Sequence, residues 1–294
     1  MTTSVAQDAA RQVEELLDFF RLAEQPFSLS PDPRFLYHTE NHLIAFTRCR
    51  QNIVQRQGLS VVVGDVGTGK STVARRLFLD FTHDEVASEY ATRFVKNASN
   101  WTTSNKMIQA LSDEFGCPPR RSEGAQWAEF ESHVQGLAAE GINVVLLIDE
   151  AQSIPKKVLI RLRELLNFEA DSVKFIQIVL LGTLELRATL QDQAVRPLRS
   201  RIAGGIATLA PLALDELREA IKFRVTVAGR TKPLFNDECY PLIHAASEGV
   251  LRDAVDISRN ALHLAFEDRE SVISPTTVSL AVDGFDKAAA QDNG

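Results

Sequence analysis

The sequence lacks several features that mark specialised classes of protein. Its 294 residues include only 15 glycines, 11 prolines and 3 cysteines. The low glycine and proline content excludes collagen-like and low-complexity chains. Cys49, Cys117 and Cys239 are far apart and form no CxxC pair, so the sequence indicates neither a disulfide framework nor a zinc site.

Long apolar runs and a basic excess are also missing. The longest apolar run, Val144–Ile148, is far shorter than the roughly 20 residues that cross a bilayer. The first 30 residues carry several acidic side chains and no apolar core of a signal peptide, so we expect a cytoplasmic chain without a membrane span. The net charge of −7 excludes a broadly basic nucleic-acid coat but not a local basic surface.

Short apolar segments alternate with helical patterns over the first two thirds of the chain. Strand-like, β-branched segments lie at 59–63, 91–95, 144–148 and 174–181. Helical periodicity is found at 39–57, 71–82, 103–115, 125–140 and 155–168. This alternation predicts an α/β fold in which helices cover both faces of a parallel sheet.

The last third of the chain is expected to be all helical. After about residue 211 the strand pattern stops, and helices are predicted at 215–229, 237–247, 251–268 and 275–284. A helix at 9–22 and an irregular, proline-rich segment precede the first strand. We therefore predict an N-terminal helix and segment (1–38), an α/β domain (39–211), a helical domain (212–285) and a disordered tail (286–294).

The segment that follows the first strand carries the most specific motif. Gly64–Ser71 fits GxxxxGK[ST] between a strand and a helix, which predicts a phosphate-binding loop. The alternative, a glycine-rich turn that contains Lys70 and Ser71 by chance, does not explain this context. Lys70 would bind the β- and γ-phosphates, and the Ser71 hydroxyl would bind Mg²⁺. Nucleotide contacts are expected from Gly64, Asp65, Val66, Gly67, Thr68, Gly69, Lys70, Ser71 and Thr72.

An acidic pair, Asp149 and Glu150, ends the strand at 144–148. Carboxylates at the carboxyl end of an adjacent parallel strand would face the phosphate loop. We expect Asp149 and Ser71 to hold Mg²⁺ and Glu150 to orient or deprotonate the attacking water. A pair that only caps the next helix is the alternative. Its combination with the phosphate loop favours hydrolysis of a nucleoside triphosphate over binding alone.

Several further residues have two interpretations. Arg196, Arg199 and Arg201 could supply a cation to a neighbouring subunit's γ-phosphate, or form a basic solvated loop. Arg252 could reach back to the phosphates or be a surface arginine in the first turn of its helix. Thr183 could contact the attacking water or cap a turn.

Taken together, these motifs resemble the AAA+ ATPases, and in particular the ExeA/GspA-like branch. The similarity extends over roughly residues 18–285. The matching segments are Gln25–Phe27 with Ser30–Tyr37, Gly64–Ser71, Leu147–Gln152, Leu165–Glu169, Leu181–Leu186, Arg199–Ile202 with Pro211–Leu212, and Gly249–Arg252.

This resemblance implies that ATP and Mg²⁺ bind between the α/β domain and a helical lid, at an interface with a neighbouring subunit. It makes Arg201 the preferred arginine finger and Arg199 the reserve. It places Arg252 at the sensor 2 position. The segment from Phe27 to Tyr37 would border the adenine. Lys70, Ser71, Asp149 and Glu150 keep the roles derived above.

The resemblance also implies an oligomeric switch, a ring or a helical filament, that recruits or remodels a protein partner. The TnsC/TniB/MuB-type transposition regulators share the architecture, which makes DNA a second candidate partner. The missing membrane segment is typical of that group, and an ExeA/GspA-like secretion or pilus assembly ATPase is the alternative. Candidate DNA-contacting groups, each of which could equally be a solvated surface, are Lys96, Asn97, Trp101, Lys106, Arg120, Arg121, Lys156, Lys157, Arg161 and Arg163.

Overall fold

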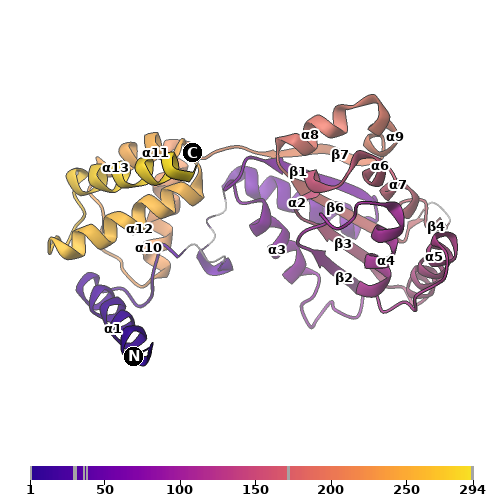
Figure 1. Ribbon diagram of the computed structural model, residues 1–294, viewed down its shortest axis with the longest axis horizontal. Helices are drawn as coiled ribbons and strands as arrows, with labels where there is room; N and C mark the ends of the chain where they lie inside the picture. Colours follow the sequence, from indigo (N-terminus) through magenta and orange to yellow (C-terminus); the bar gives the residue numbers. More distant parts are fainter. Residues whose placement is uncertain (1, 29–31, 36, 38, 171–172, 293–294) are drawn as a thin grey trace. The chain divides into compact units, whose positions relative to one another are not determined.

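The chain folds into two compact units (Figure 1). The computed structural model describes residues 2–28, 32–35, 37, 39–170 and 173–292. Glu40–Ala210 form one unit, here called the α/β unit. Met1–Thr39 and Pro211–Gly294 together form the other, the helical unit. The N-terminal segment therefore belongs with the C-terminal helices and not with the sheet.

The α/β unit is built on a parallel sheet. Its strands are β1 (Leu59–Gly64), β2 (Tyr90–Val95), β3 (Asn143–Ile148), β6 (Ile176–Gly182) and β7 (Ile202–Leu209). They lie in the order β2-β3-β6-β1-β7, and every neighbouring pair is parallel. The expected α/β fold is thus confirmed. The expectation that β3 is adjacent to β1 is wrong, because β6 lies between them.

Alternating side chains of the strands build a separate core on each face of the sheet. Val61 and Leu146 belong to one core, and Val62 and Leu147 to the other. This explains why the strands are apolar throughout, because both faces are covered. The first core packs against α4 (Ser104–Glu114), α5 (Glu123–Ala139), α6 (Lys156–Leu159), α7 (Leu162–Leu165), α8 (Leu184–Gln191) and α9 (Arg196–Arg199). The second packs against α2 (Glu40–Val54) and α3 (Lys70–Asp80).

The structure departs from the sequence patterns in three places in this unit. The edge strand β7 was not expected, because Gly204 and Gly205, both with positive φ, interrupt its apolar pattern. The helix expected at 155–168 is two short helices, α6 and α7, because the amide of Arg161 bonds the carbonyl three residues back. The segment expected as one strand at 174–181 contains the end of β5 (Val173–Lys174), which pairs with β4 (Glu169–Ala170), followed by β6.

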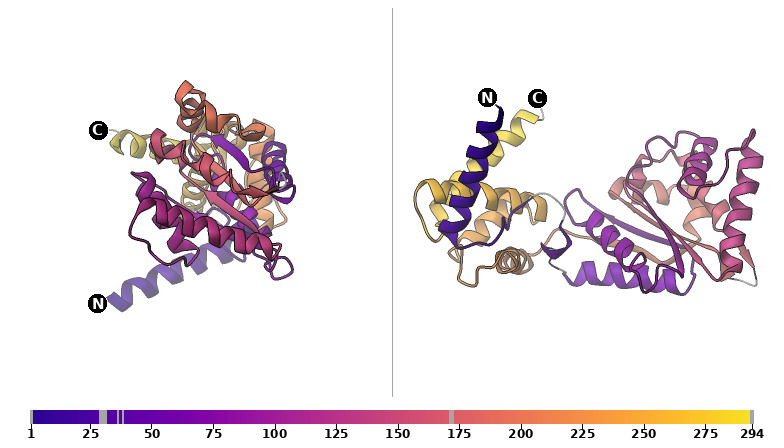
Figure 2. Two further views of the ribbon diagram at one scale, coloured as in Figure 1. Left: turned by 90° about the vertical axis from the view of Figure 1, so that its right-hand side faces the viewer. Right: turned by 90° about the horizontal axis from the view of Figure 1, so that it is seen from below.

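The helical unit contains α1 (Thr2–Phe20), the 3-10 turn η1 (Pro33–Phe35), α10 (Leu214–Val227), α11 (Cys239–Ser247), α12 (Leu251–Glu267) and α13 (Pro275–Asp292) (Figure 2). Apolar residues of α1 and of α10 to α13 share one core. The Ser274 hydroxyl accepts a hydrogen bond from the amide of Thr277, as expected of an N-cap.

Two terminal helices are longer than the sequence patterns suggested. α1 begins at Thr2, whereas helical periodicity started only at residue 9. α13 continues to Asp292, so most of the expected disordered tail is helical. Its last turns contain three alanines in succession, and alanine is the strongest helix former. Among the described residues, no helix is both long and apolar enough to span a bilayer.

Candidate nucleotide-binding site

The loop between β1 and α3 is held in a tight curl. Gly64 has no room for a side chain, since a Cβ atom there would lie 2.6 Å from Thr68 Oγ1 and 2.7 Å from the carbonyl oxygen of Leu209. Gly69 has a φ of +90°, which favours glycine, and it is the N-cap residue of α3. The turn closes where Thr68 donates from both its amide and its hydroxyl to the Asp65 carbonyl. The sequence motif therefore folds as a compact loop that ends at a helix N-terminus.

His42 on α2 supports this loop from outside the motif. Its Nε2 lies 2.8 Å from the carbonyl oxygen of Thr68, and the side chain is buried. A Cβ atom on Gly69 would lie 2.5 Å from the same ring nitrogen. Sequence reasoning missed His42, because no local pattern connects a helix residue with a loop 26 residues later.

Lys70 turns its side chain back over the loop. Its Nζ donates to the carbonyl oxygens of Gly64 at 3.0 Å and Asp65 at 2.7 Å. Burial lowers the pKa of Lys70, and the negative charges of nearby carboxylates, Glu150 first, oppose this shift. The ammonium group is thus within electrostatic reach of the acidic pair that follows β3.

Asp149 and Ser71 meet at the carboxyl edge of the sheet. The buried Asp149 carboxylate accepts hydrogen bonds from the Ser71 side chain and, at 2.9 Å, from the amide of Glu150. Burial raises the pKa of Asp149, and these two hydrogen bonds partly oppose the rise. The residues that the sequence predicts as magnesium ligands are therefore in contact, although β6 lies between β3, which precedes Asp149, and β1, which precedes the loop.

Glu150, Gln152 and Thr183 form a second cluster at the same edge. Glu150 is exposed and has a φ of +53°, uncommon for a residue other than glycine. Gln152 donates from Nε2 to Glu150 Oε2 at 2.5 Å and accepts at Oε1 from the Thr183 amide at 3.1 Å. Thr183 Oγ1 is buried and has no hydrogen-bond partner among the described residues. The sequence assigns no role to Gln152 beyond its place at the end of the segment Leu147–Gln152, because its partner Thr183 lies 31 residues later.

Arg199 and Arg201 lie far from this edge within their own chain. They precede β7, whose first residue, Ile202, pairs with Leu59, whereas Leu209 pairs with Gly64. On β1 these two pairs are five residues apart, roughly 16 Å, which is more than an arginine side chain can span. Arg199 donates to the carbonyl of Gln191 at 3.1 Å.

Arg201 has a different environment. The side chain is half-buried. Its charge is a minor cause of the lowered pKa of Glu169, which is set mainly by the hydrogen bond from Lys174. Of the two arginines, Arg199 is the one held by a backbone hydrogen bond.

Tyr37 and Arg252 belong to the helical unit. The Tyr37 ring lies 5.9 Å from the ring of Phe223, and Arg252 is exposed in the first turn of α12. Their expected contacts with a nucleotide stay predictions.

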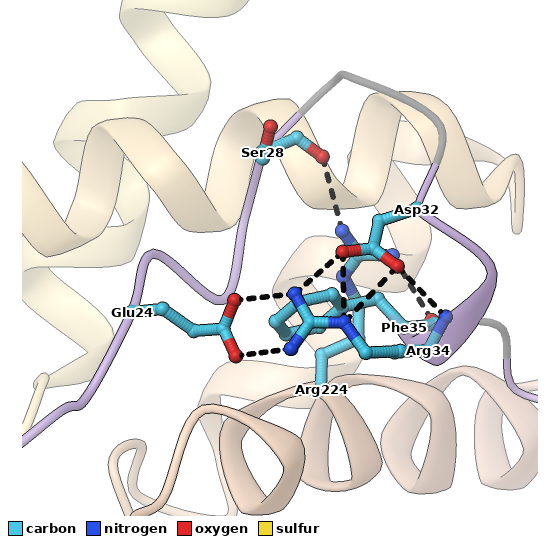
Figure 3. A network of polar contacts seen from close by, with 6 residues as sticks. All are labelled: Glu24, Ser28, Asp32, Arg34, Phe35 and Arg224. Carbon is cyan, nitrogen blue, oxygen red and sulfur yellow. Dashed lines mark hydrogen bonds and ion pairs between the residues drawn. The ribbon is translucent and has the colours of Figure 1, made fainter.

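The proline-rich segment, residues 26–37, is tied to α10 by one buried arginine (Figure 3). Arg224 donates to the carbonyl oxygens of Pro26, Ser28 and Phe35 at 2.8, 3.0 and 3.2 Å. Burial lowers its pKa to about 10. A second cluster in the same segment joins Arg34 to Glu24 and Asp32. The N-terminal segment is thus anchored to a helix about 190 residues later in the sequence.

Four of the ten candidate DNA-contacting groups are buried or ion-paired within the protein. Trp101 is 1% exposed, so its ring is not available for stacking on a base. Three of the cations form ion pairs, which are Arg120 with Glu129, Lys156 with Asp192, and Arg161 with Glu123 and Glu164. The alternative interpretation, a solvated surface, therefore fits these three cations better.

The donor set at the carboxyl edge fits a magnesium ion. Ser71 and Asp149 supply two oxygens in contact with each other, and Mg²⁺ normally keeps several waters besides a few protein oxygens. Within the described part of the chain, no group of three or more His, Cys, Asp or Glu residues forms a metal site.

Comparisons with known proteins show which fold this chain has. Residues 51–190 match the family model of the AAA domain. Solved structures with the same fold include Cdc6p from Pyrobaculum aerophilum, with a TM-score of 0.67 and 19% identity over 88% of this chain and 71% of that one. Another is the ORC1 protein of Aeropyrum pernix in complex with DNA, with a TM-score of 0.63 and 18% identity over 88% and 68%. The chain has the P-loop AAA+ fold.

One curated relative is more similar in sequence than these solved structures and indicates a branch within the AAA+ proteins. General secretion pathway protein A of Aeromonas hydrophila is 32% identical over 94% of this chain and 49% of its own length. The expected resemblance to the AAA+ ATPases of the ExeA/GspA-like branch is thus confirmed. It spans about half the length of the curated relatives it matches.

Proposed function

We propose that the protein binds and hydrolyses ATP with Mg²⁺ and acts as an oligomeric, nucleotide-dependent switch. The observation that carries this proposal is the contact between Ser71 and the buried Asp149 beside the Lys70 ammonium. It places a cation and two candidate magnesium ligands at one sheet edge. The match of residues 51–190 to the AAA domain also supports nucleotide hydrolysis.

In this proposal the loop amides and Lys70 bind the phosphates of ATP. Ser71 and Asp149 hold Mg²⁺, which would neutralise charge that develops on the β- and γ-phosphate oxygens. Glu150 accepts a proton from the attacking water and fixes its direction. Thr183, whose buried hydroxyl has no partner among the described residues, would bind the same water or a phosphate oxygen.

The direct test is ATP binding and turnover by the wild type and by Lys70→Ala. We expect Lys70→Ala to abolish binding or hydrolysis. Lys174→Ala is a matched control, because Lys174 also donates to a backbone carbonyl, that of Leu166, at 3.1 Å. Unchanged turnover in Lys70→Ala would refute the site, as would equal losses in both variants.

We further propose that Arg201 completes the site of a neighbouring subunit. The support is its position at the end of β7 opposite the phosphate loop, roughly 16 Å along β1, so Arg201 does not reach the loop of its own chain. We expect Arg201→Ala to bind ATP but to lose assembly-dependent hydrolysis. Arg199→Ala is the control, since Arg199 is held by the Gln191 carbonyl.

A mixing experiment tests this second proposal. Arg201→Ala subunits keep Glu150, and Glu150→Gln subunits keep Arg201. If the arginine acts between subunits, a mixture of the two impaired variants hydrolyses ATP faster than either variant alone. A mixture that assembles but is no faster than the separate variants would refute the proposal.

For the partner, we propose a protein of a secretion-type assembly, as the name of the Aeromonas hydrophila relative suggests. The alternative is a transposition regulator that polymerises on DNA. Among the candidate DNA-contacting groups, the buried ring of Trp101 and the ion-paired Arg161 give this alternative little support. We expect no DNA binding that increases with a non-hydrolysable ATP analogue. Binding that does increase, and that weakens with salt, would favour the alternative.

A further inference from the structure

Gln152 bridges the ends of two strands at the proposed catalytic edge. Its side-chain amide lies between the carboxylate of Glu150, which follows β3, and the backbone amide of Thr183, which follows β6. A carboxylate only accepts hydrogen bonds and a backbone N–H only donates one. A single orientation of the Gln152 amide therefore satisfies both neighbours, and both ends of the side chain are used.

Gly182 and the pairing of β3 with β6 leave room for this bridge and hold its two ends in place. A Cβ atom on Gly182 would lie 2.8 Å from Gln152 Oε1, so a larger residue would displace the amide. β3 and β6 are paired directly, with Ile148 opposite Leu180, which keeps the two strand ends in register. The bridge thus joins two segments that the sheet already holds close together.

We propose that Gln152 is a positioning residue that aims the Glu150 carboxylate and couples it to the strand end that carries Thr183. This inference rests on the proposed ATPase function. Glu150 is exposed, so without the bridge its carboxylate would sample several rotamers. The hydrogen bond from Gln152 selects one of them. A shift of Thr183 on nucleotide binding would be transmitted to Glu150 through the same amide.

The proposal predicts a loss of turnover without a loss of nucleotide affinity. Misplacing a catalytic group by about 1 Å can cost on the order of 100-fold in rate. We expect Gln152→Ala to lower kcat by about 10- to 100-fold and to change the dissociation constant of a fluorescent ATP analogue by less than about threefold. A wild-type kcat in Gln152→Ala would overturn the proposal.

Gln152→Glu separates aiming from simple support of the backbone. This variant can still accept the Thr183 N–H but presents a carboxylate to Glu150 in place of a donor. We expect its kcat to fall at least as far as that of Gln152→Ala. A kcat near that of the wild type would mean that Gln152 only supports Thr183, and would refute the proposal.

Two comparisons complete the test. Gln135→Ala is the matched control, because Gln135 also donates to a glutamate, Glu131, on the exposed face of α5. Its kcat should equal that of the wild type. In a Glu150→Gln background, Gln152→Ala should cause no further loss, because Gln152 acts through Glu150. A full, additive loss in that background would contradict the mechanism.

The outcomes distinguish this inference from the proposed function. If the wild type neither binds nor hydrolyses ATP, the proposed function and this inference both fail. If the wild type hydrolyses ATP and Gln152→Ala does so equally fast, only the role of Gln152 fails.

Discussion

Placing a methyl group on Gly69 tests whether His42 supports the phosphate loop. Gly69→Ala forces an L residue to a φ of +90°, which costs about 1–2 kcal/mol. It also places a Cβ atom 2.5 Å from His42 Nε2, and overpacking of this kind costs about 1–3 kcal/mol. We therefore expect Gly69→Ala to lower the free energy of unfolding of the α/β unit by about 2–5 kcal/mol.

Two other glycines of the same unit separate these contributions. Gly141 has a φ of +82° but nothing within 4 Å of an added Cβ, so Gly141→Ala should cost only the backbone strain, about 1–2 kcal/mol. Gly136 lies within α5, also in open space, and Gly136→Ala should stabilise the unit by roughly 0.5–1 kcal/mol. The excess cost of Gly69→Ala over Gly141→Ala measures the clash.

Urea unfolding followed by tryptophan fluorescence provides the assay. The two tryptophans of the chain, Trp101 and Trp127, both lie in the α/β unit, so their emission reports on that unit. In a His42→Ala background, the cost of Gly69→Ala should fall by about 1–3 kcal/mol, because the clash is gone. Equal costs of Gly69→Ala in both backgrounds would refute the proposed support by His42.

Three further substitutions have defined outcomes. Arg224→Met leaves three carbonyls without their donor and should lower the free energy of unfolding of the helical unit by about 2–4 kcal/mol. Far-UV circular dichroism measures this change, and a loss below about 0.5 kcal/mol would contradict the anchoring role. Gly249→Ala should destabilise the same unit by about 2–5 kcal/mol, because the added Cβ would lie 2.3 Å from the Leu212 carbonyl oxygen at a φ of +77°. This loss should not alter the tryptophan transition. Because burial raises the pKa of Asp149, its contribution to stability is full below the ordinary aspartate pKa and is lost as pH rises through the raised value. Asp149→Asn should therefore exceed the wild type in Tm at neutral pH, and the gain should disappear in acid; an offset independent of pH would contradict this reasoning.

Much of the α/β unit could be predicted from local patterns. The run Val144–Ile148 is apolar at every position because both faces of its strand are buried, and a parallel strand is the simplest structure with that property. The predicted phosphate loop could also be recognised from the sequence, because its backbone curl needs glycines at that spacing before Lys70. β7 could not be predicted, since Gly204 and Gly205 break its pattern and its pairing with β1 holds it in the sheet.

The sequence by itself determined the two motifs on which the proposed chemistry depends, namely the predicted phosphate loop that ends at Ser71 and the acidic pair Asp149 and Glu150. Each is a short motif whose function follows from a few neighbouring residues. Only the tertiary structure decided which distant groups touch them. The insertion of β6 between β1 and β3, the contact of His42 with the loop and the bridge from Gln152 to Thr183 depend on strand order and packing. Contacts between segments far apart in the sequence leave no local pattern, because only the folded chain brings them together.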